Sequence, residues 1–590
     1  MELRGEQALV VRTRLPLAAA LAALALAAPA DAATAPTEPV FDQDGRLVET
    51  PFIPADGAAR LTDRQATRLL LRDDKVADWL DRYPPDPQTD AEYRPATDEW
   101  VVKAWSGEAG QIVLGKVDDR TGEVREAWTG PQVAWSMARG GAGAFGGRTI
   151  NGMWLWLAFC AVFLVGLADL RRPLSLRNLD LLALLSFSIS LRFFNEGEIF
   201  WSAPLAYPPL VYLLGRCLWI ARRNRPPRST PPVWPVWLLA GACVFLTGFR
   251  VGLNVEAQRS VIDVGFAGVV GAHRIANGQM PYGHMPVQDD RPACGTADAE
   301  GEIRERIQTN GRCESSNPRG DTYGPVSYLA YLPGYAVFGW SGKWDELWAA
   351  HATSLLFDAL CILGIALVGR RYGGPWLGAA LAFAWAAYPF TLYASNSNTN
   401  DAIMPAFLIW GFWLASSAWA RGAAIALAGW TKFAALLLAP LWLSYPDGWR
   451  LPTRRFVLGF AGATLAAFLV LLLEPDPLHA ARVFAERTFG FQLDRESPFS
   501  IWGWGQYRAA GVPDLHVVQQ VLQVLVAAGA VLLAFVPRRK SILQLAALTA
   551  AVLIGFELVL THWFYLYIPW FFPFIAFAVL YRRDPAAQVH

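Results

Sequence analysis

Long apolar segments with almost no fixed charge recur along most of this sequence, and they constrain its fold more than any other feature. Runs of roughly 17–22 such residues match the length that a helix needs to cross a bilayer. Because the chain of 590 residues is 54% hydrophobic and only 17% charged, we predict a polytopic α-helical membrane protein. The net charge of +1 gives no indication of nucleic-acid binding. About 12–13 spans are expected, over 153–170, 179–194, 203–221, 234–253, 346–369, 375–393, 402–420, 456–474, 516–536, 542–561 and 565–581, with a broken segment over 422–445.

Short basic clusters between these segments predict how the helices are oriented. If the N-terminal region lies outside the cytoplasm, all of the clusters fall on the cytoplasmic side, as the positive-inside rule requires. The clusters are Arg171/Arg172, Arg222/Arg223/Arg225, Arg370/Arg371, Arg421, Arg454/Arg455, Arg538/Arg539/Lys540 and Arg582/Arg583. We therefore expect a multi-pass plasma-membrane protein whose loops at 254–345, 395–401, 474–515 and 561–563 lie outside.

The first 32 residues have the pattern of an export signal. Arg12 and Arg14 precede an apolar run over Leu15–Ala28, and Ala30-Asp31-Ala32 fits a cleavage site. The segment is either cleaved or kept as an anchor helix. In both cases the residues that follow are expected outside the cytoplasm.

The polar region 33–139 predicts a small extracytoplasmic α+β domain. A helix is expected over Leu61–Tyr83, strands over 100–105 and 111–117, and then a turn with Gly122 in the left-handed region before another strand. The helix followed by strands, with Asp-Arg-Thr-Gly-Glu-Val in that turn, resembles a PepSY-like domain. The resemblance implies binding or regulation, and no chemistry is assigned there.

Asp263 attracts attention because it lies just after an apolar span, where ionisable groups are costly and often mark a site. It opens Ile262-Asp263-Val264-Gly265, which runs on to Gly278-Gln279-Met280-Pro281-Tyr282. Further motifs lie on the same predicted side of the membrane or lead to it: Thr322-Tyr323-Gly324-Pro325-Val326-Ser327-Tyr328, Gly429-Trp430-Thr431-Lys432-Phe433, Ser497-Pro498-Phe499-Ser500-Ile501-Trp502 and His562-Trp563-Phe564-Tyr565.

In this order, the motifs resemble GT-C glycosyltransferases, and most closely the polyprenol-phosphate-mannose-dependent α-mannosyltransferase type. The resemblance implies that a sugar, with mannose as the nearest comparison, moves from a polyprenyl-phosphate donor to an envelope glycolipid, glycan or protein on the external face. It implies no metal and no other cofactor. One departure is the long insertion between Tyr282 and Tyr323, which could select the acceptor or indicate a different sugar.

The predicted organisation follows from these segments. It consists of a signal or anchor over 1–32, the PepSY-like domain over 33–139, a linker over 140–152, additional transmembrane helices over 153–233, the GT-C-like catalytic domain over 234–581 and a cytoplasmic tail over 582–590.

Glycosyl transfer from a lipid phosphate needs a base for the acceptor hydroxyl and cations for the leaving phosphate. Asp263 is predicted to be the base, and its alternative is a cap for the following helix. Lys432 either binds phosphate or snorkels from a helix end. Arg495 is either a second phosphate ligand or a solvated loop charge.

The remaining candidates come from the matching motifs. His562 either contacts a substrate or packs in an interfacial aromatic belt. Tyr282 and Ser497 are assigned to substrate binding by the resemblance. Asp401 is interpreted as a helix cap, and its alternative is a ligand.

Two cysteines, Cys294 and Cys313, fall in one predicted external loop. An oxidising compartment would allow a disulfide between them, and the alternative is two free thiols.

Two other classes of function remain open at this point. The chain could be a non-enzymatic membrane scaffold or sensor that binds an envelope partner through its N-terminal domain. It could also be a lipid or solute transporter, although the sequence shows no inverted repeats of the kind that transporters tend to have.

Overall fold

The structure is a computed structural model that describes residues 40–41, 47–49, 59–141, 145–226, 234–257, 260–285, 292, 305–307, 313–315, 320–342, 347–448, 452–493 and 495–582. It divides the chain into two compact units. The smaller comprises the described parts of Met1–Asp73 with Thr89–Lys103 and Gly115–Ala127, and the larger comprises Asp74–Gln88, Ala104–Leu114 and the chain from Trp128 onward. The predicted export signal over 1–32 lies outside the described residues.

A four-stranded sheet and two short helices are the main elements of the N-terminal region. The strands are β3 (Gln88–Arg94), β4 (Glu99–Trp105), β5 (Gln111–Asp118) and β6 (Val124–Thr129), and each pairs with the next along the chain. Two shorter pairs are β1 (Val40–Phe41) with β2 (Leu47–Glu49), and β7 (Glu305–Ile307) with β8 (Cys313–Ser315). Strands therefore form where 100–105 and 111–117 predicted them.

The helix predicted over Leu61–Tyr83 is in fact two helices, α2 (Asp63–Leu71) and α3 (Asp74–Leu80). A capping box opens α2, in which the Thr62 hydroxyl accepts from the Gln65 N–H at 3.3 Å and the Gln65 side chain accepts from the Thr62 N–H at 2.8 Å. The first helix ends at Leu71, with Arg72 as its C-cap, and α3 begins at Asp74. The amphipathic pattern of the sequence therefore extends over two helices.

Asp119 holds the residues just before α2 against the four-stranded sheet. Its buried carboxylate accepts the backbone N–H groups of Arg60 at 2.7 Å and Leu61 at 2.9 Å, and Trp100 Nε1 at 2.8 Å. The turn that follows has Gly122 at φ 72°, the left-handed conformation predicted from the sequence.

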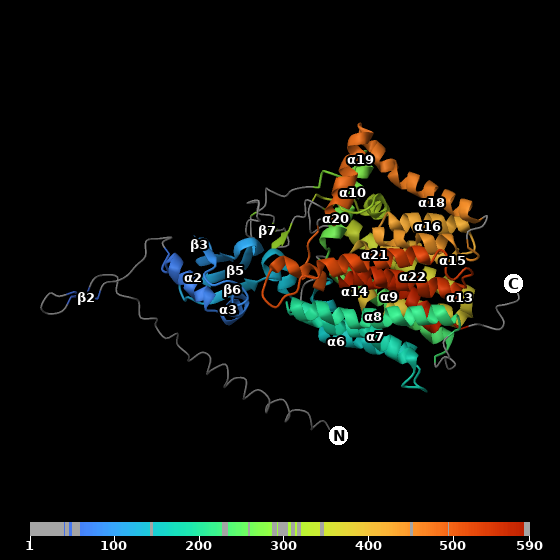
Figure 1. Ribbon diagram of the computed structural model, residues 1–590, viewed down its shortest axis with the longest axis horizontal. Coiled ribbons are helices and arrows are strands. Elements are labelled where there is room, and N and C mark those ends of the chain that lie inside the picture. Colours follow the sequence, from blue (N-terminus) through green and yellow to red (C-terminus); the bar gives the residue numbers. More distant parts are fainter. Residues whose placement is uncertain are drawn as a thin grey trace, which may run out of the picture. The chain divides into compact units, whose positions relative to one another are not determined.

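Helices build the larger unit almost entirely (Figure 1). Its principal helices are α6 (Met153–Leu167), α7 (Leu176–Asn195), α8 (Ile199–Arg223), α9 (Val236–Glu256), α10 (Asp263–Ala276), α11 (Pro325–Leu329), α12 (Leu332–Phe338), α13 (Trp348–Ala387), α14 (Pro389–Asn396), α15 (Ile403–Trp413), α16 (Ala418–Gly429), α17 (Ala439–Leu443), α18 (Pro452–Phe468), α19 (Pro477–Ala485), α20 (Phe491–Leu493), α21 (His516–Leu532), α22 (Ile542–Leu558) and α23 (Ile568–Leu580). Short 3-10 segments join them, including η3 (Asn400–Ala402), η4 (Phe433–Leu438), η5 (Leu469–Leu473), η7 (Ile501–Tyr507) and η8 (Tyr565–Tyr567).

Three helical runs among the described residues are long and apolar enough to cross a membrane: α9, α13 and the run Thr453–Leu473 of α18 and η5. The chain is therefore expected to associate with a membrane. Five shorter apolar helices accompany them, over Met153–Leu167, Phe433–Leu443, His516–Leu532, Ile542–Leu558 and Tyr565–Leu580.

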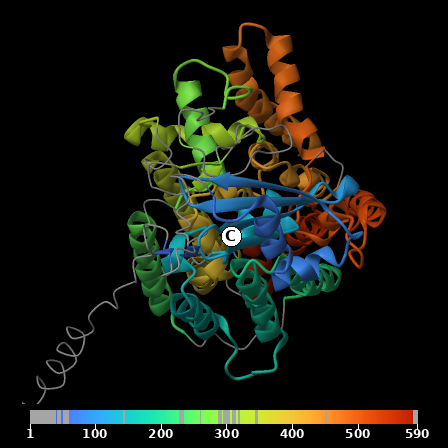
Figure 2. The ribbon, with the colours of Figure 1, turned by 90° about the vertical axis from the view of Figure 1, so that its left-hand side faces the viewer.

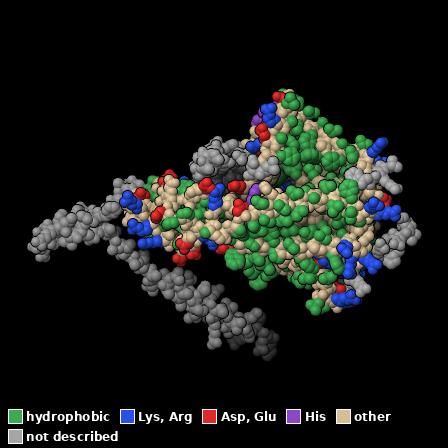
Figure 3. All heavy atoms as spheres, viewed as in Figure 1, with side chains coloured by type: hydrophobic (Ala, Val, Ile, Leu, Met, Phe, Trp, Pro, Cys, Tyr) green, Lys and Arg blue, Asp and Glu red, His purple; other side chains and the backbone are tan. Residues whose placement is uncertain are grey.

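The core of the larger unit is formed around α22 and α23, whereas several peripheral helices turn apolar side chains outward. Every residue of α23 is buried. Figure 2 shows α6, α7 and α8 on one side of this unit and α18 and α19 on the opposite side. Trp237 of α9 and Leu465 of α18 are 73% and 70% exposed, and Figure 3 shows apolar side chains covering much of the visible helical surface. An apolar surface of this extent is suited to contact with lipid.

Two helix breaks differ in how well the sequence predicted them. In α13 the helical conformation is interrupted at Gly373 and Gly374, where 346–369 and 375–393 were predicted as separate spans. The segment 402–420, predicted as one helix, instead ends as α15 at Trp413. The next helix begins after Ser417, whose hydroxyl accepts the Ala420 N–H at 3.3 Å.

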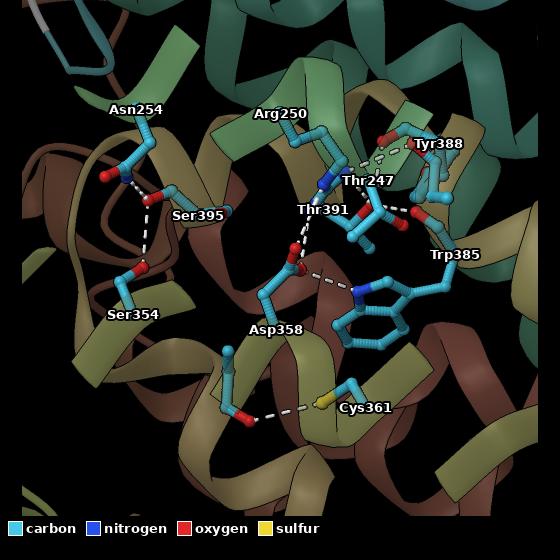
Figure 4. Close-up of polar contacts among 12 residues, drawn as sticks. Thr247, Arg250, Asn254, Ser354, Asp358, Cys361, Trp385, Tyr388, Thr391 and Ser395 are labelled. Carbon is cyan, nitrogen blue, oxygen red and sulfur yellow. Dashed lines mark hydrogen bonds and ion pairs between the residues drawn. The ribbon is translucent and has the colours of Figure 1, made fainter. Parts of the chain in front are cut away.

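A buried ion pair joins α9 to α13 (Figure 4). The Arg250 guanidinium donates to both oxygens of Asp358, at 3.0 Å and 2.6 Å, and Trp385 Nε1 donates to the same carboxylate at 2.8 Å. Another guanidinium nitrogen donates to the Thr391 hydroxyl at 3.2 Å. The Arg250 and Asp358 side chains are 1% and 5% exposed, so each charge depends on the other for compensation.

An amide network extends from this pair toward the loop after α14 (Figure 4). Asn254, one turn after Arg250, donates to the Ser395 carbonyl at 2.8 Å and to the Asn398 side chain at 2.9 Å. Ser354 of α13 donates to the same Ser395 carbonyl at 2.9 Å. The two networks therefore hold the loop after α14 against α9 and α13.

We predict that Asp358→Ala lowers the free energy of unfolding by about 3–5 kcal/mol, because it leaves Arg250 buried and unpaired. Thermal or denaturant unfolding in detergent would measure this loss. The double variant Arg250→Met/Asp358→Leu should recover most of it, since no buried charge is then left.

A matched control is Glu196→Ala, which breaks the exposed pair between Arg192 and Glu196 at the end of α7. Exposed pairs contribute about 0–1 kcal/mol, so this variant should unfold almost like the wild type. An equal loss in Asp358→Ala and Glu196→Ala would contradict the importance of the buried pair.

Candidate functional site

Asp263 is the first residue of α10 and lies half-buried beside the loop after α14. Its carboxylate accepts the next backbone N–H at 2.8 Å, while the N–H of Ile262, the N-cap, donates to the Ser397 carbonyl at 3.2 Å. A Cβ on Gly265 would overlap the carbonyl oxygen of Asn398, so only glycine lets α10 begin this close to the loop. Asp263 therefore lies in a first helical turn, where the helix dipole stabilises a carboxylate.

Lys432 stands at the break between α16 and η4, as the broken segment in the sequence predicted. Its Nζ lies 3.1 Å from Asp401 Oδ1, and the two side chains are 6% and 2% exposed. The ammonium is 4.2 Å from the centre of the Tyr323 ring and 5.7 Å from the centres of the Tyr567 and Trp570 rings. Its charge is thus balanced by one carboxylate and by aromatic faces instead of water.

The loops that carry Tyr323 and Lys432 are in direct backbone contact. The Ser327 hydroxyl donates to the Thr431 carbonyl at 3.0 Å. A Cβ on Gly324 would overlap the backbone carbonyl of Trp430, so glycine is required for this approach. Two motifs separated by about a hundred residues in the sequence therefore form one wall of the site.

Arg495, His562 and Ser497 form a hydrogen-bonded row. The Arg495 guanidinium lies 3.0 Å from His562 Nε2, and Ser497 Oγ lies 2.9 Å from His562 Nδ1. Because a guanidinium can only donate, Nε2 must accept, and a neutral imidazole then carries its proton on Nδ1 and donates to Ser497. Burial, reinforced by the cationic Arg495 and Lys432, holds the pKa of His562 well below its ordinary value and keeps the ring neutral.

The side chain of Tyr323 lies close to several of these charged groups. Burial raises the pKa of its hydroxyl, the positive charge of Arg495 opposes that rise, and the carboxylates of Asp263 and Asp401 add to it. The charges of Asp263, Asp401 and Arg495 all act on the pKa of this hydroxyl, so these groups lie near the ring that also contacts Lys432. The structure therefore gathers Asp263, Lys432, Arg495, His562 and Ser497 into one region.

Tyr282 contacts the loop that carries Tyr323, and its role in substrate binding stays a prediction. Its side chain is fully buried, its hydroxyl donates to the Tyr323 carbonyl at 3.0 Å, and its ring packs 5.2 Å from that of Phe484. Nearby, the fully buried carboxylate of Asp321 binds Arg487 through two guanidinium nitrogens, the shorter contact being 2.6 Å. Tyr282 thus supports the loop that carries Tyr323.

Sequence reasoning missed the partner of Lys432. Asp401 was interpreted as a helix cap, but it is buried in η3, where it pairs with Lys432 and accepts from Trp570 Nε1 at 3.1 Å. The available signal was the run of Asn and Ser residues before Asp401, since polar side chains in so apolar a chain are expected to form buried networks.

Two further predictions concern cysteines and metals. Cys294 and the Cys313 side chain lie outside the described residues, so their disulfide stays a prediction. In the part of the chain that the structure describes, no group of three or more His, Cys, Asp or Glu side chains could hold a metal ion. The absence of a cofactor also stays a prediction.

No protein-family model matches the sequence, and no curated protein matches it.

We predict that Gly324→Ala destabilises the protein, because the added Cβ must push the Tyr323 loop away from the Trp430 carbonyl. Overpacking of this kind costs about 1–3 kcal/mol, which unfolding in detergent can measure. The control is Gly462→Ala in α18, where an added Cβ meets no heavy atom within 4 Å. Equal stability of the two variants would show that the two loops are not held as closely as described.

Proposed function

We propose that this protein is an integral membrane glycosyltransferase of GT-C type. It transfers a sugar, with mannose as the nearest comparison, from a polyprenyl-phosphate donor to an envelope glycolipid, glycan or protein. In this proposal the chain crosses the membrane many times, the basic clusters face the cytoplasm, and the site faces outward.

The observation that carries the proposal is the combination of a helix-initiating carboxylate with two cations around Tyr323. Lys432 is already paired with Asp401. Arg495 differs, because among the described residues its guanidinium forms a hydrogen bond only with the neutral His562 and lies over the ring of Phe491, and its Nε is buried without a hydrogen-bond acceptor. A buried donor without a partner favours an anionic ligand.

The proposed reaction assigns a role to each group. Asp263 accepts the proton of the acceptor hydroxyl while that oxygen attacks the anomeric carbon of the donor sugar. The bond between this carbon and the phosphate oxygen breaks, and polyprenyl phosphate leaves with the electron pair. Arg495 and Lys432 stabilise the negative charge on the leaving phosphate, and His562 with Ser497 holds Arg495 in place.

Asp263→Asn tests the base. We expect the rate of sugar transfer from a radiolabelled polyprenyl-phosphate sugar to fall by about 100-fold or more, because a positioned base contributes on the order of 100- to 10,000-fold. The control is Glu256→Gln, which neutralises an exposed carboxylate at the end of α9. A folded Asp263→Asn protein with wild-type transfer would remove the central assignment and favour a scaffold or transporter.

Arg495→Gln tests the phosphate ligand. The KM for the donor should rise by about 10- to 100-fold, since a hydrogen bond to a charged group contributes roughly 1.5–3 kcal/mol. Arg482→Gln, at an exposed position on α19, is the matched control and should leave this KM unchanged. A donor KM that is equally unchanged in both variants would mean that Arg495 is only a solvated loop charge.

A further inference from the structure

Part of the N-terminal region belongs to the larger unit and packs on the loop that carries Arg495 and Ser497. The Tyr83 hydroxyl, just after α3, donates to the Tyr507 carbonyl at 2.8 Å. The N–H of Ala510 donates to the Arg82 carbonyl at 2.9 Å, and Arg508 forms an ion pair with Glu108. These contacts hold the far end of the loop, after η7.

A second segment of the N-terminal region reaches the other end of the same loop. It consists of the short helix α4 (Pro131–Ala134) and the residue that follows, Trp135. The Trp135 ring centre lies 5.5 Å from that of Phe499 and 5.9 Å from that of His562, with 35° between the Trp135 and His562 planes. Trp135 is half-buried and covers part of the imidazole.

The segment that carries Trp135 is itself anchored. Gln132 of α4 donates to the Gly197 carbonyl at 3.0 Å, and Lys75 Nζ donates to the Gln132 side chain at 2.5 Å. A Cβ on Gly130 would meet the Trp79 ring at 2.6 Å, so the chain enters α4 in close contact with α3. The position of Trp135 is therefore fixed by contacts of α4 and of the residue before it.

Both edges of the His562 ring are already occupied, one by Arg495 and the other by Ser497. The rings of Trp135, Phe499 and Tyr567 pack against the imidazole, with interplanar angles of 35°, 82° and 55°. Trp135 is therefore the ring most nearly parallel to it and lies over part of its face. The charged groups that act on the ring are Arg495 from the loop and Lys432 from the break after α16, and both are cations. Water reaching the ring would solvate the imidazolium and so favour protonation at Nε2, after which His562 could no longer accept from Arg495.

We propose that Trp135, from the N-terminal region, is a positioning residue of the transfer site: it covers His562 and keeps the imidazole in the neutral, Nε2-accepting form that orients Arg495 toward the donor phosphate. This proposal rests on the proposed function. It makes the segment around Trp135 a structural part of the site, so that the appended N-terminal region has a role in donor binding.

The first arm of the test does not need sugar transfer. Because the folded pKa of His562 lies below its unfolded value of about 6.5, the unfolded state binds the proton first, and folding stability falls as pH drops below about 6.5. Thermal unfolding in detergent between about pH 8 and pH 5 measures that slope. His562→Gln should remove the part of the slope that belongs to His562.

Trp135→Ala should also flatten this part of the slope, because a hydrated imidazole titrates closer to its ordinary pKa. Trp135→Phe keeps an aromatic cover and should retain most of the slope. The matched control is Trp105→Ala at the end of β4, which should keep all of it. A wild-type slope in Trp135→Ala, or a loss as large in Trp105→Ala, would overturn the proposal.

The second arm measures transfer from a polyprenyl-phosphate sugar. Trp135→Ala should raise the donor KM by roughly tenfold, equivalent to about 1.4 kcal/mol, and move the acid limb of the pH profile toward higher pH. A folded Trp135→Ala protein with wild-type KM and pH profile would overturn the role in donor binding. If the wild type transfers no sugar while the slopes differ as expected, the proposed function fails but the contact of Trp135 with His562 stands.

Discussion

The geometry of the site depends on a buried ion pair, that of Arg250 on α9 with Asp358 on α13. Two charges removed from water must be matched closely, so the relative position of these helices is tightly specified. The adjoining amides extend that constraint to the loop after α14, where Asn254 holds the Asn398 side chain. The same loop contacts the first turn of α10 on one side and leads to Asp401 on the other.

The loop after α14 positions both the carboxylate of Asp263 and the ammonium of Lys432, which have opposite charges in the proposed reaction. Asp263 is placed by the contact of α10 with the loop, and Lys432 is placed by its pairing with Asp401 just beyond it. The proposed base and one of the two proposed phosphate ligands therefore depend on the same loop. Arg495 is held separately, by the neutral His562, and it forms no ion pair with a carboxylate among the described residues. A guanidinium without a carboxylate partner is suited to bind the phosphate of a substrate.

Much of the element order could be predicted from the sequence. Apolar length located the helices near their observed positions, and Gly122 and the Gly373–Gly374 break were readable because glycine permits conformations closed to other residues. The partners of the buried charged residues could not be predicted from the sequence. Nothing local in the sequence indicates that Arg250 pairs with Asp358, or that Asp401 pairs with Lys432, because the members of each pair lie in different segments of the chain.

The sequence by itself determined a chain that is mostly helical, apolar enough to associate with a membrane, and provided with a polar N-terminal region, because length, hydropathy and turn residues act locally. It also supplied the candidate residues Asp263, Lys432, Arg495 and His562. The tertiary structure alone decided that Arg495 hydrogen-bonds to His562, that Tyr282 holds the loop of Tyr323, and that the Trp135 ring packs against His562. Those relations arise from packing between distant segments, which no local pattern encodes.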